Sequence, residues 1–224
     1  MILDPLYILM AIPGLLFGFY ATWKTKSTFK RYAQYAASSR MTGAQAARRL
    51  LDQEGLHAVR VEPVQGFLSD HYDPRTRTLR LSPDVYNSPS LSAIGVACHE
   101  AGHAIQHATQ YAPLQFRSAL VPVTQFSTNL VYIIFIAGMF MNLPVLMNAA
   151  ILLFSVVVLF TVVTLPVEWD ASARAKKLMV SSGIVSAREQ EDAARVLNAA
   201  FLTYVSALIT ALLTLLYFIL RARR

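Results

Sequence analysis

Four long apolar runs constrain this chain more than any other feature of its sequence. They extend over residues 7–23, 120–141, 143–165 and 200–220. A helix of about 20 apolar residues is long enough to cross the hydrocarbon core of a bilayer. A mean hydropathy of +0.43 and a charged fraction of 15% are also unusual for a water-soluble domain of this size. We therefore expect a mainly α membrane protein with about four transmembrane helices.

The segment between the first two runs has mixed helix and strand patterns, which predict a small α+β domain. Thr42 and Gln45 match a helix capping box, and Gly55 suits the end of that helix. Strand patterns follow at residues 58–62, 67–72 and 77–81. The last two flank Asp73-Pro74, a turn dipeptide, so we expect them to form a short β-hairpin.

A metal-binding motif, His99-Glu100-Ala101-Gly102-His103, follows these strands. Ser90 suits the N-cap of a helix that carries the motif and ends near His107. Histidines four residues apart lie on one helix face, so His99 and His103 can bind the same zinc ion. Glu100 can then hold and deprotonate a zinc-bound water. The pattern predicts a hydrolase with one Zn²⁺ per chain.

A catalytic zinc site needs a third protein ligand, and the sequence offers several. The candidates are His107, Glu168, Asp170, Asp70, His71 and Asp73. On a straight helix His107 is roughly 12 Å from His99 along the axis, too far for tetrahedral ligands. Glu168 is better placed, because two spans joined by a tight turn return the chain to the face of the motif helix. Pro166 suits the first turn of a new helix carrying Glu168.

Further motifs make the chain resemble the bacterial YugP-type membrane zinc metallopeptidases over nearly its whole length. The motifs are Leu68-Ser69-Asp70-His71-Tyr72-Asp73-Pro74, Leu79-Arg80-Leu81-Ser82-Pro83, His99-Glu100-Ala101-Gly102-His103-Ala104-Ile105-Gln106, Leu165-Pro166-Val167-Glu168-Trp169-Asp170-Ala171-Ser172 and Leu202-Thr203-Tyr204. The resemblance implies a gluzincin-like site with His99, His103 and Glu168 as zinc ligands and Glu100 as the catalytic carboxylate. The HtpX and CAAX prenyl protease group is more distantly similar and has an aspartate where this chain has Ser172.

The remaining site candidates are chemically able to support the metal ligands or to stabilise an oxyanion. They are His71, Tyr72, Asp170, Arg174 and Tyr204. The strand at 77–81 is a plausible sheet edge to which a peptide substrate can add. Cys98 is the only cysteine, so the sequence excludes intrachain disulfides and a cysteine-rich zinc site.

These features divide the chain into five expected parts. They are an N-terminal transmembrane anchor at 1–23, a peptidase domain at 24–119, a transmembrane hairpin at 120–165, a membrane-proximal helical segment with the third zinc ligand at 166–199, and a C-terminal transmembrane helix with a basic tail at 200–224. We expect a zinc endopeptidase that cleaves membrane-associated or misfolded proteins. A zinc-binding scaffold without proteolytic activity, and an amide hydrolase acting on a non-protein substrate, are the alternatives.

The net charge of +7 fits a partner with negative charge. With so much apolar sequence we expect a lipid bilayer as that partner, together with a peptide or protein substrate, and no nucleic acid. Most cationic residues near span ends lie on the side of the motif helix, which predicts a multi-pass protein of the bacterial plasma membrane with a cytoplasmic active site. The tail residues Arg221, Arg223 and Arg224 lie on the other side. The oligomeric state is left open.

Overall fold

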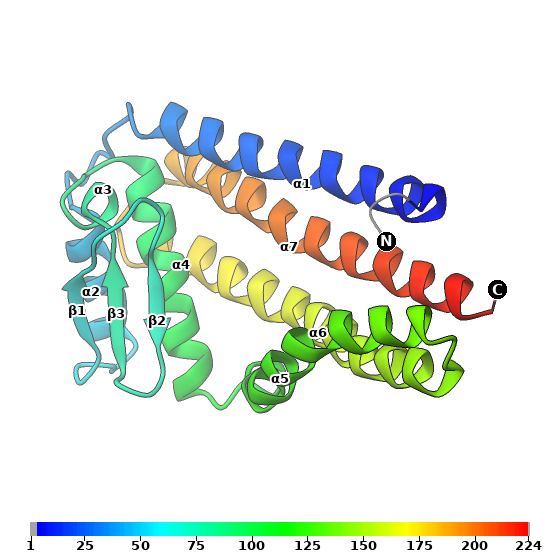
Figure 1. The fold of residues 1–224 in the computed structure, drawn as a ribbon. Coiled ribbons are helices and arrows are strands. Elements are labelled where there is room, and N and C mark those ends of the chain that lie inside the picture. Colours follow the sequence, from blue (N-terminus) through cyan, green and yellow to red (C-terminus); the bar gives the residue numbers. More distant parts are fainter. Residues whose placement is uncertain (1–3, 224) are drawn as a thin grey trace. The chain divides into compact units, whose positions relative to one another are not determined.

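The fold is described by a computed structural model covering residues 4–223, and it is mainly helical with one small sheet (Figure 1). The elements are α1 (Pro5–Tyr32), α2 (Gly43–Gln53), β1 (Arg60–Pro63), β2 (His71–Asp73), β3 (Thr78–Leu81), α3 (Pro83–Tyr86), α4 (Leu91–Ala108), α5 (Ala112–Phe140), α6 (Pro144–Ser181) and α7 (Ala187–Ala222). Among the described residues, α1, α5, α6 and α7 are long and apolar enough to cross a membrane. The expected fold class, a mainly α membrane protein with a small sheet, is confirmed.

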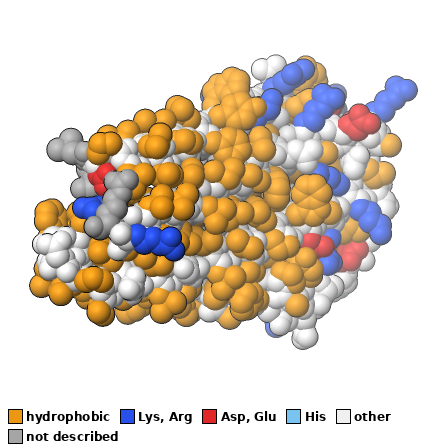
Figure 2. Space-filling model, turned by 90° about the vertical axis from the view of Figure 1, so that its right-hand side faces the viewer, with side chains coloured by type: hydrophobic (Ala, Val, Ile, Leu, Met, Phe, Trp, Pro, Cys, Tyr) orange, Lys and Arg blue, Asp and Glu red, His pale blue; other side chains and the backbone are white. Residues whose placement is uncertain are grey.

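The chain forms two compact units. One, which we call the membrane unit, comprises Met1–Thr22, Pro113–Pro166 and Leu202–Arg224. The other, the α/β unit, comprises Trp23–Ala112 and Val167–Phe201. Of the expected basic tail, Arg224 lies outside the described residues. Broad areas of the surface carry hydrophobic side chains with few charges among them (Figure 2), as expected of helices that are surrounded by lipid.

In the membrane unit, α5 and α6 form the expected tight helical hairpin. Asn142 in the connection adopts a left-handed backbone conformation, with φ of 52°. Gly138 lets the two helices approach, since a Cβ there would lie 2.9 Å from the backbone nitrogen of Met147. Phe135 of α5 and Phe218 of α7 stack with ring centroids 4.0 Å apart, inside a fully helical apolar core.

In the α/β unit, a three-stranded sheet has the order β1-β3-β2. β3 pairs with β1 in parallel and with β2 antiparallel. The expected hairpin is therefore confirmed, but the prediction that the strand at 77–81 is a sheet edge is wrong. Three of the four residues of β3 are buried, which is the pattern of a central strand covered on both faces. β2 is an edge strand instead.

The second expected strand, at 67–72, begins later than predicted, at His71. Positive φ angles at Gly66 and Leu68 make the preceding segment a loop. Asp70 fixes this loop to the N-terminus of α3 by accepting hydrogen bonds from the backbone nitrogen and the hydroxyl of Ser82, at 2.7 and 3.1 Å. A side chain that binds the backbone of another segment in this way competes with regular strand pairing.

Pro166 does not begin a new helix, because α6 continues without a break from Pro144 to Ser181. A proline inside a helix removes one backbone hydrogen bond and clashes with the carbonyl four residues earlier, so a helix boundary is the usual expectation. Here tertiary packing on both sides of the proline keeps the helix continuous, as the burial of Thr164 and Val167 indicates. One helix therefore contains both the third apolar run and Glu168.

Candidate metal centre

The helix that carries the motif, α4, is the most buried helix of the α/β unit. Ser90 caps it as expected, accepting a hydrogen bond from the backbone nitrogen of Ala93. Ile94, Ala97 and Cys98 are fully buried and fix one face of the helix in the core. His99 and His103 share another face, and their ring centroids lie 4.8 Å apart in an edge-to-face arrangement.

Helix α6 reaches α4 through a close backbone approach at Gly102. A Cβ on Gly102 would lie 2.7 Å from the carbonyl oxygen of Ala171, closer than real Cβ atoms come to such an atom. Glycine is therefore required at the centre of the motif, between the two histidines. This contact brings the turn of α6 that contains Glu168 directly onto the histidine face.

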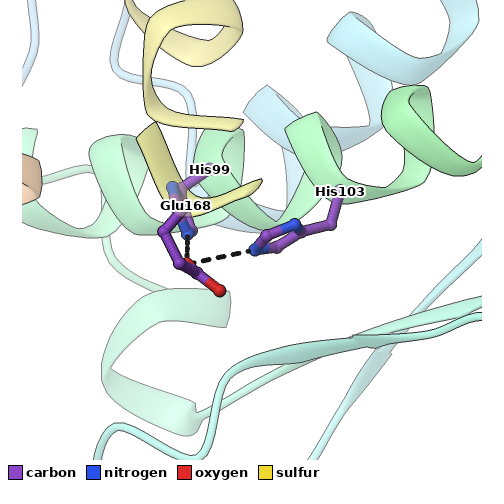
Figure 3. A group of neighbouring side chains, drawn as sticks. All are labelled: His99, His103 and Glu168. Carbon is purple, nitrogen blue, oxygen red and sulfur yellow. Dashed lines mark hydrogen bonds and ion pairs between the residues drawn. The ribbon is translucent and has the colours of Figure 1, made fainter. Parts of the chain in front are cut away.

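The carboxylate of Glu168 lies between the two histidine rings (Figure 3). Its Oε2 is 3.2 Å from Nε2 of His99 and 3.5 Å from Nε2 of His103. The side chain of Glu168 is only 2% exposed, and the histidines are 13% and 12% exposed. One ligand atom from each of the three residues lies within 4.8 Å of the others. Three convergent donors on largely buried side chains are what a metal cation requires.

Gln106 determines which nitrogen of His103 is available to a metal. Its Nε2 donates to the carbonyl oxygen of Val167 at 2.8 Å and to Oδ2 of Asp170 at 2.9 Å. Both of these partners are acceptors, so the Oε1 of Gln106 must face Nδ1 of His103, 3.0 Å away. Nδ1 then carries the proton, and Nε2 presents its lone pair beside Glu168.

His99 is held in the same way from the other helix. The hydroxyl of Ser172 lies 3.1 Å from Nδ1 of His99, which leaves Nε2 facing Glu168. A hydroxyl can accept the Nδ1 proton, as an aspartate would, but it adds no negative charge beside the ring.

Two imidazole nitrogens and one carboxylate oxygen fit zinc. Catalytic zinc sites have three protein ligands of these types and keep one position open. The protonated Nδ1 positions add the outer hydrogen bonds that usually orient zinc-binding histidines. The donor set is also poor for Mg²⁺ or Ca²⁺, which prefer oxygen ligands only.

Glu100 follows His99 on α4, is not one of these three donors and is half-buried. Within residues 4–223 its carboxylate makes no hydrogen bond or ion pair with protein groups, so it is available to a water or substrate. Its charge also acts on Asp70: burial raises the pKa of Asp70, hydrogen bonds from Ser82 lower it, and the nearby Glu100 adds to the rise.

The other predicted site residues fall into separate groups. Asp170 is connected to the metal centre through Gln106. Its Oδ2 accepts a hydrogen bond from Gln106 and another from Nε of Arg174, at 2.6 Å. The hydroxyl of Tyr72 lies 2.9 Å from Nδ1 of His107, and burial raises the pKa of this tyrosine. His107 is thus outside the donor triad, as expected from its spacing.

The remaining candidates lie in β2, on the buried face of α4 or in the other unit. His71 is exposed, with Nδ1 bonded to the carbonyl oxygen of Ser69. Asp73 is the last residue of β2, and hydrogen bonds from Thr76, the Arg75 backbone and Arg80 lower its pKa to about 2. Tyr204 belongs to the membrane unit. Cys98 is fully buried, and this burial raises the pKa of its thiol to about 12, so it is no nucleophile.

The sequence analysis missed Gln106 and Ser172 as contributors to the site. Gln106 was quoted only as the last residue of the motif that begins at His99, although a glutamine three residues after His103 lies on the same helix face. Such a residue is usually exposed, and here it is fully buried. Its burial depends on the docking of α6, which spacing along α4 does not reveal.

Replacement of Gln106 with Leu is expected to weaken zinc binding by about 10- to 100-fold, the usual effect of losing an outer hydrogen bond to a metal ligand. Leucine fills a similar volume but leaves Nδ1 of His103 without its acceptor and Asp170 without one donor. Zinc affinity by competition with a fluorescent chelator measures the effect. Replacement of the exposed Gln53 with Leu is the matched control and should leave the affinity unchanged.

Comparisons with known proteins identify the family of the chain. Residues 7–223 match the protein family described as "Putative neutral zinc metallopeptidase". The chain is also 46% identical over 215 residues to the "Putative membrane protease YugP" of Bacillus subtilis (strain 168), covering 96% of each chain. No solved structure gives a significant match.

Proposed function

Because the chain belongs to this family of neutral zinc metallopeptidases, we propose that it is a membrane-embedded endopeptidase with His99, His103 and Glu168 as its zinc ligands. The observation that carries the proposal is the convergence of Nε2 of both histidines on Oε2 of Glu168. Zinc at such a site supplies Lewis acidity, which polarises a scissile carbonyl and lowers the pKa of a coordinated water toward about 7.

Glu100 acts as the general base and acid. Its carboxylate, free of protein partners within residues 4–223, takes the proton from the attacking water and delivers it to the nitrogen of the leaving amine. The carbonyl carbon gains the oxygen of water as its bond to the amine nitrogen breaks, and one proton of that water passes by way of Glu100 to the nitrogen. His99 and His103 stay hydrogen-bonded through Nδ1 to Ser172 and Gln106, respectively, throughout the reaction, so the orientation of the two rings does not change.

The substrate is an extended peptide that adds to the free edge of β2. This strand, not β3, has an unpaired side among the described strands, and it packs against α4. An extended peptide gains main-chain hydrogen bonds at a sheet edge without requiring a particular side-chain sequence. Tyr72, whose hydroxyl is held by His107, is the candidate donor to the oxyanion on this side.

The active site lies close to one membrane surface. No charged residue occurs between Arg117 and Glu168, and Glu168 follows Pro166, the last residue of the membrane unit within α6, by two positions. At 1.5 Å per residue these positions differ by roughly 3 Å along the helix. The excess of Lys and Arg near the span ends on this side supports a cytoplasmic location in a bacterial plasma membrane. The substrates are then membrane-associated or misfolded proteins that reach the site from this side of the membrane.

The test is zinc-dependent cleavage of an unstructured protein by the purified full chain in lipid nanodiscs. We expect internal fragments, loss of cleavage to background after chelation, and recovery on adding one equivalent of Zn²⁺. Mg²⁺ serves as the control and should not restore activity, because imidazole ligands suit zinc.

Zinc-loaded protein that cuts no protein substrate would contradict the proposal and favour a scaffold. Cleavage of small amides without cleavage of proteins would instead favour a hydrolase of non-protein substrates. Release of terminal residues alone would contradict the assignment as an endopeptidase.

A further inference from the structure

Asp170 and Arg174 form an ion pair on α6 that the proposed reaction does not use. Nε of Arg174 donates to Oδ2 of Asp170 at 2.6 Å, one helical turn away. Ion pairs of this spacing on a helix surface usually contribute little. Here the side chains of Arg174 and Asp170 are only 29% and 27% exposed, and the same Oδ2 accepts a hydrogen bond from the fully buried Gln106. The pair is therefore connected to the interior of the α/β unit.

The orientation of the Gln106 amide depends on where the Asp170 carboxylate lies. The two N–H groups of Gln106 donate to the carbonyl oxygen of Val167 and to Oδ2 of Asp170. This arrangement directs Oε1 of Gln106 to Nδ1 of His103, 3.0 Å away. The reverse orientation would place Oε1 against two oxygens that cannot donate. If Asp170 turned away, one buried N–H would lose its acceptor, and the carbonyl of Val167 alone would hold the amide.

Arg174 is the group that keeps this carboxylate in place. Besides its bond to Asp170, its guanidinium carbon lies over the ring of Tyr111, 5.7 Å from the centroid. The ring is itself fixed at the end of α4, because the backbone nitrogen of Tyr111 donates to the carbonyl oxygen of Gln106 at 2.9 Å. A planar guanidinium that is held by a carboxylate on one side and an aromatic face on another has little freedom to rotate.

We propose that Arg174 is a positioning residue for the metal centre. It holds the Asp170 carboxylate at the place where Gln106 donates to it. Oε1 of Gln106 thereby stays on Nδ1 of His103, and Nε2 of that ring remains directed at the metal. The inference rests on the proposed role of His103 as a zinc ligand. It requires that Arg174 affects zinc binding through Gln106 and by no other route.

The first experiment measures the zinc affinity of the full chain in nanodiscs by competition with a fluorescent chelator. Arg174→Gln is expected to weaken zinc binding by roughly three- to tenfold, less than Gln106→Leu, because the effect passes through two further side chains. Arg174→Lys should recover most of the affinity, since a lysine four residues after an aspartate on a helix can still pair with it. Lys177→Gln is the matched control, because it removes an exposed positive charge from the same helix.

The second experiment combines Arg174→Gln with Gln106→Leu. If Arg174 acts through Gln106, the doubly substituted protein should bind zinc as tightly as Gln106→Leu alone. A residue that only stabilised the fold would lower the affinity by the same factor in both backgrounds. The helical content of all these proteins should equal that of wild type.

Wild-type zinc affinity in Arg174→Gln would overturn the inference, as would an equal loss with and without Gln106. Unchanged affinity together with a lower kcat would mean that Arg174 contacts the substrate, and this result would overturn the inference as well. The proposed function fails on a different result, which is undiminished zinc affinity in His103→Ala. If His103→Ala loses zinc while Arg174→Gln binds it as wild type does, the inference alone is wrong.

Discussion

Replacement of Glu100 with Gln is expected to reduce cleavage by about 10²- to 10⁴-fold while zinc remains bound. The reduction is the usual contribution of a general base and acid, and glutamine can neither take nor return the proton. The zinc donors are unaffected because Glu100 lies outside the triad of His99, His103 and Glu168. The measurement is kcat for an unstructured protein, with zinc content determined in parallel.

Replacement of the exposed Glu54 with Gln is the matched control, and its activity should equal that of wild type. Full cleavage by the Glu100→Gln protein would refute the proposed role of this carboxylate. Loss of zinc in the same protein would indicate that Glu100 contributes to the metal site, which the described geometry does not support.

Replacement of Glu168 with Ala is expected to lower zinc affinity by roughly 100- to 1,000-fold and to abolish cleavage. Zinc sites with four protein ligands bind with about 10–16 kcal/mol, so one ligand corresponds to roughly 3 kcal/mol, and each 1.4 kcal/mol is a factor of ten. The substitution also removes the only negative charge among the three clustered donors. Equilibrium dialysis against buffered zinc gives the affinity.

The control for this substitution is Glu191→Ala, which removes an exposed carboxylate from α7. Both proteins should keep the helical content of wild type, since alanine favours helices. Stoichiometric zinc with unchanged affinity in Glu168→Ala would mean that another residue is the third ligand. Asp170 is the nearest alternative, although it already accepts hydrogen bonds from Gln106 and Arg174.

The features that the sequence predicted correctly depend on local spacing or on chain direction. The capping box at Thr42 and the cap at Ser90 involve residues three positions apart, and both are present. The proximity of Glu168 to the histidines was inferred from the direction of the chain. Two spans joined by a tight turn return the chain to the membrane face at which the motif helix lies. The ligand roles of these residues remain a prediction.

The features that were missed depend on contacts between distant segments. The parallel pairing of β1 with β3 makes β3 central, and no pattern within residues 77–81 specifies that partner. The continuity of α6 through Pro166 depends on packing that outweighs a local preference for a helix boundary. The hydrogen bonds of Gln106 and Ser172 require α6 to lie against α4 at Gly102.

The continuity of α6 has a mechanical consequence. The lipid acts on this helix through its apolar length, and a mismatch with the bilayer thickness is relieved by tilting or by a shift along the membrane normal, at fractions of a kcal/mol per ångström. Glu168 is part of that same helix but belongs, like His99 and His103, to the α/β unit. One of the three clustered donors is therefore carried by a helix whose other half is a candidate membrane span, an attachment to the lipid that a water-soluble zinc peptidase does not have.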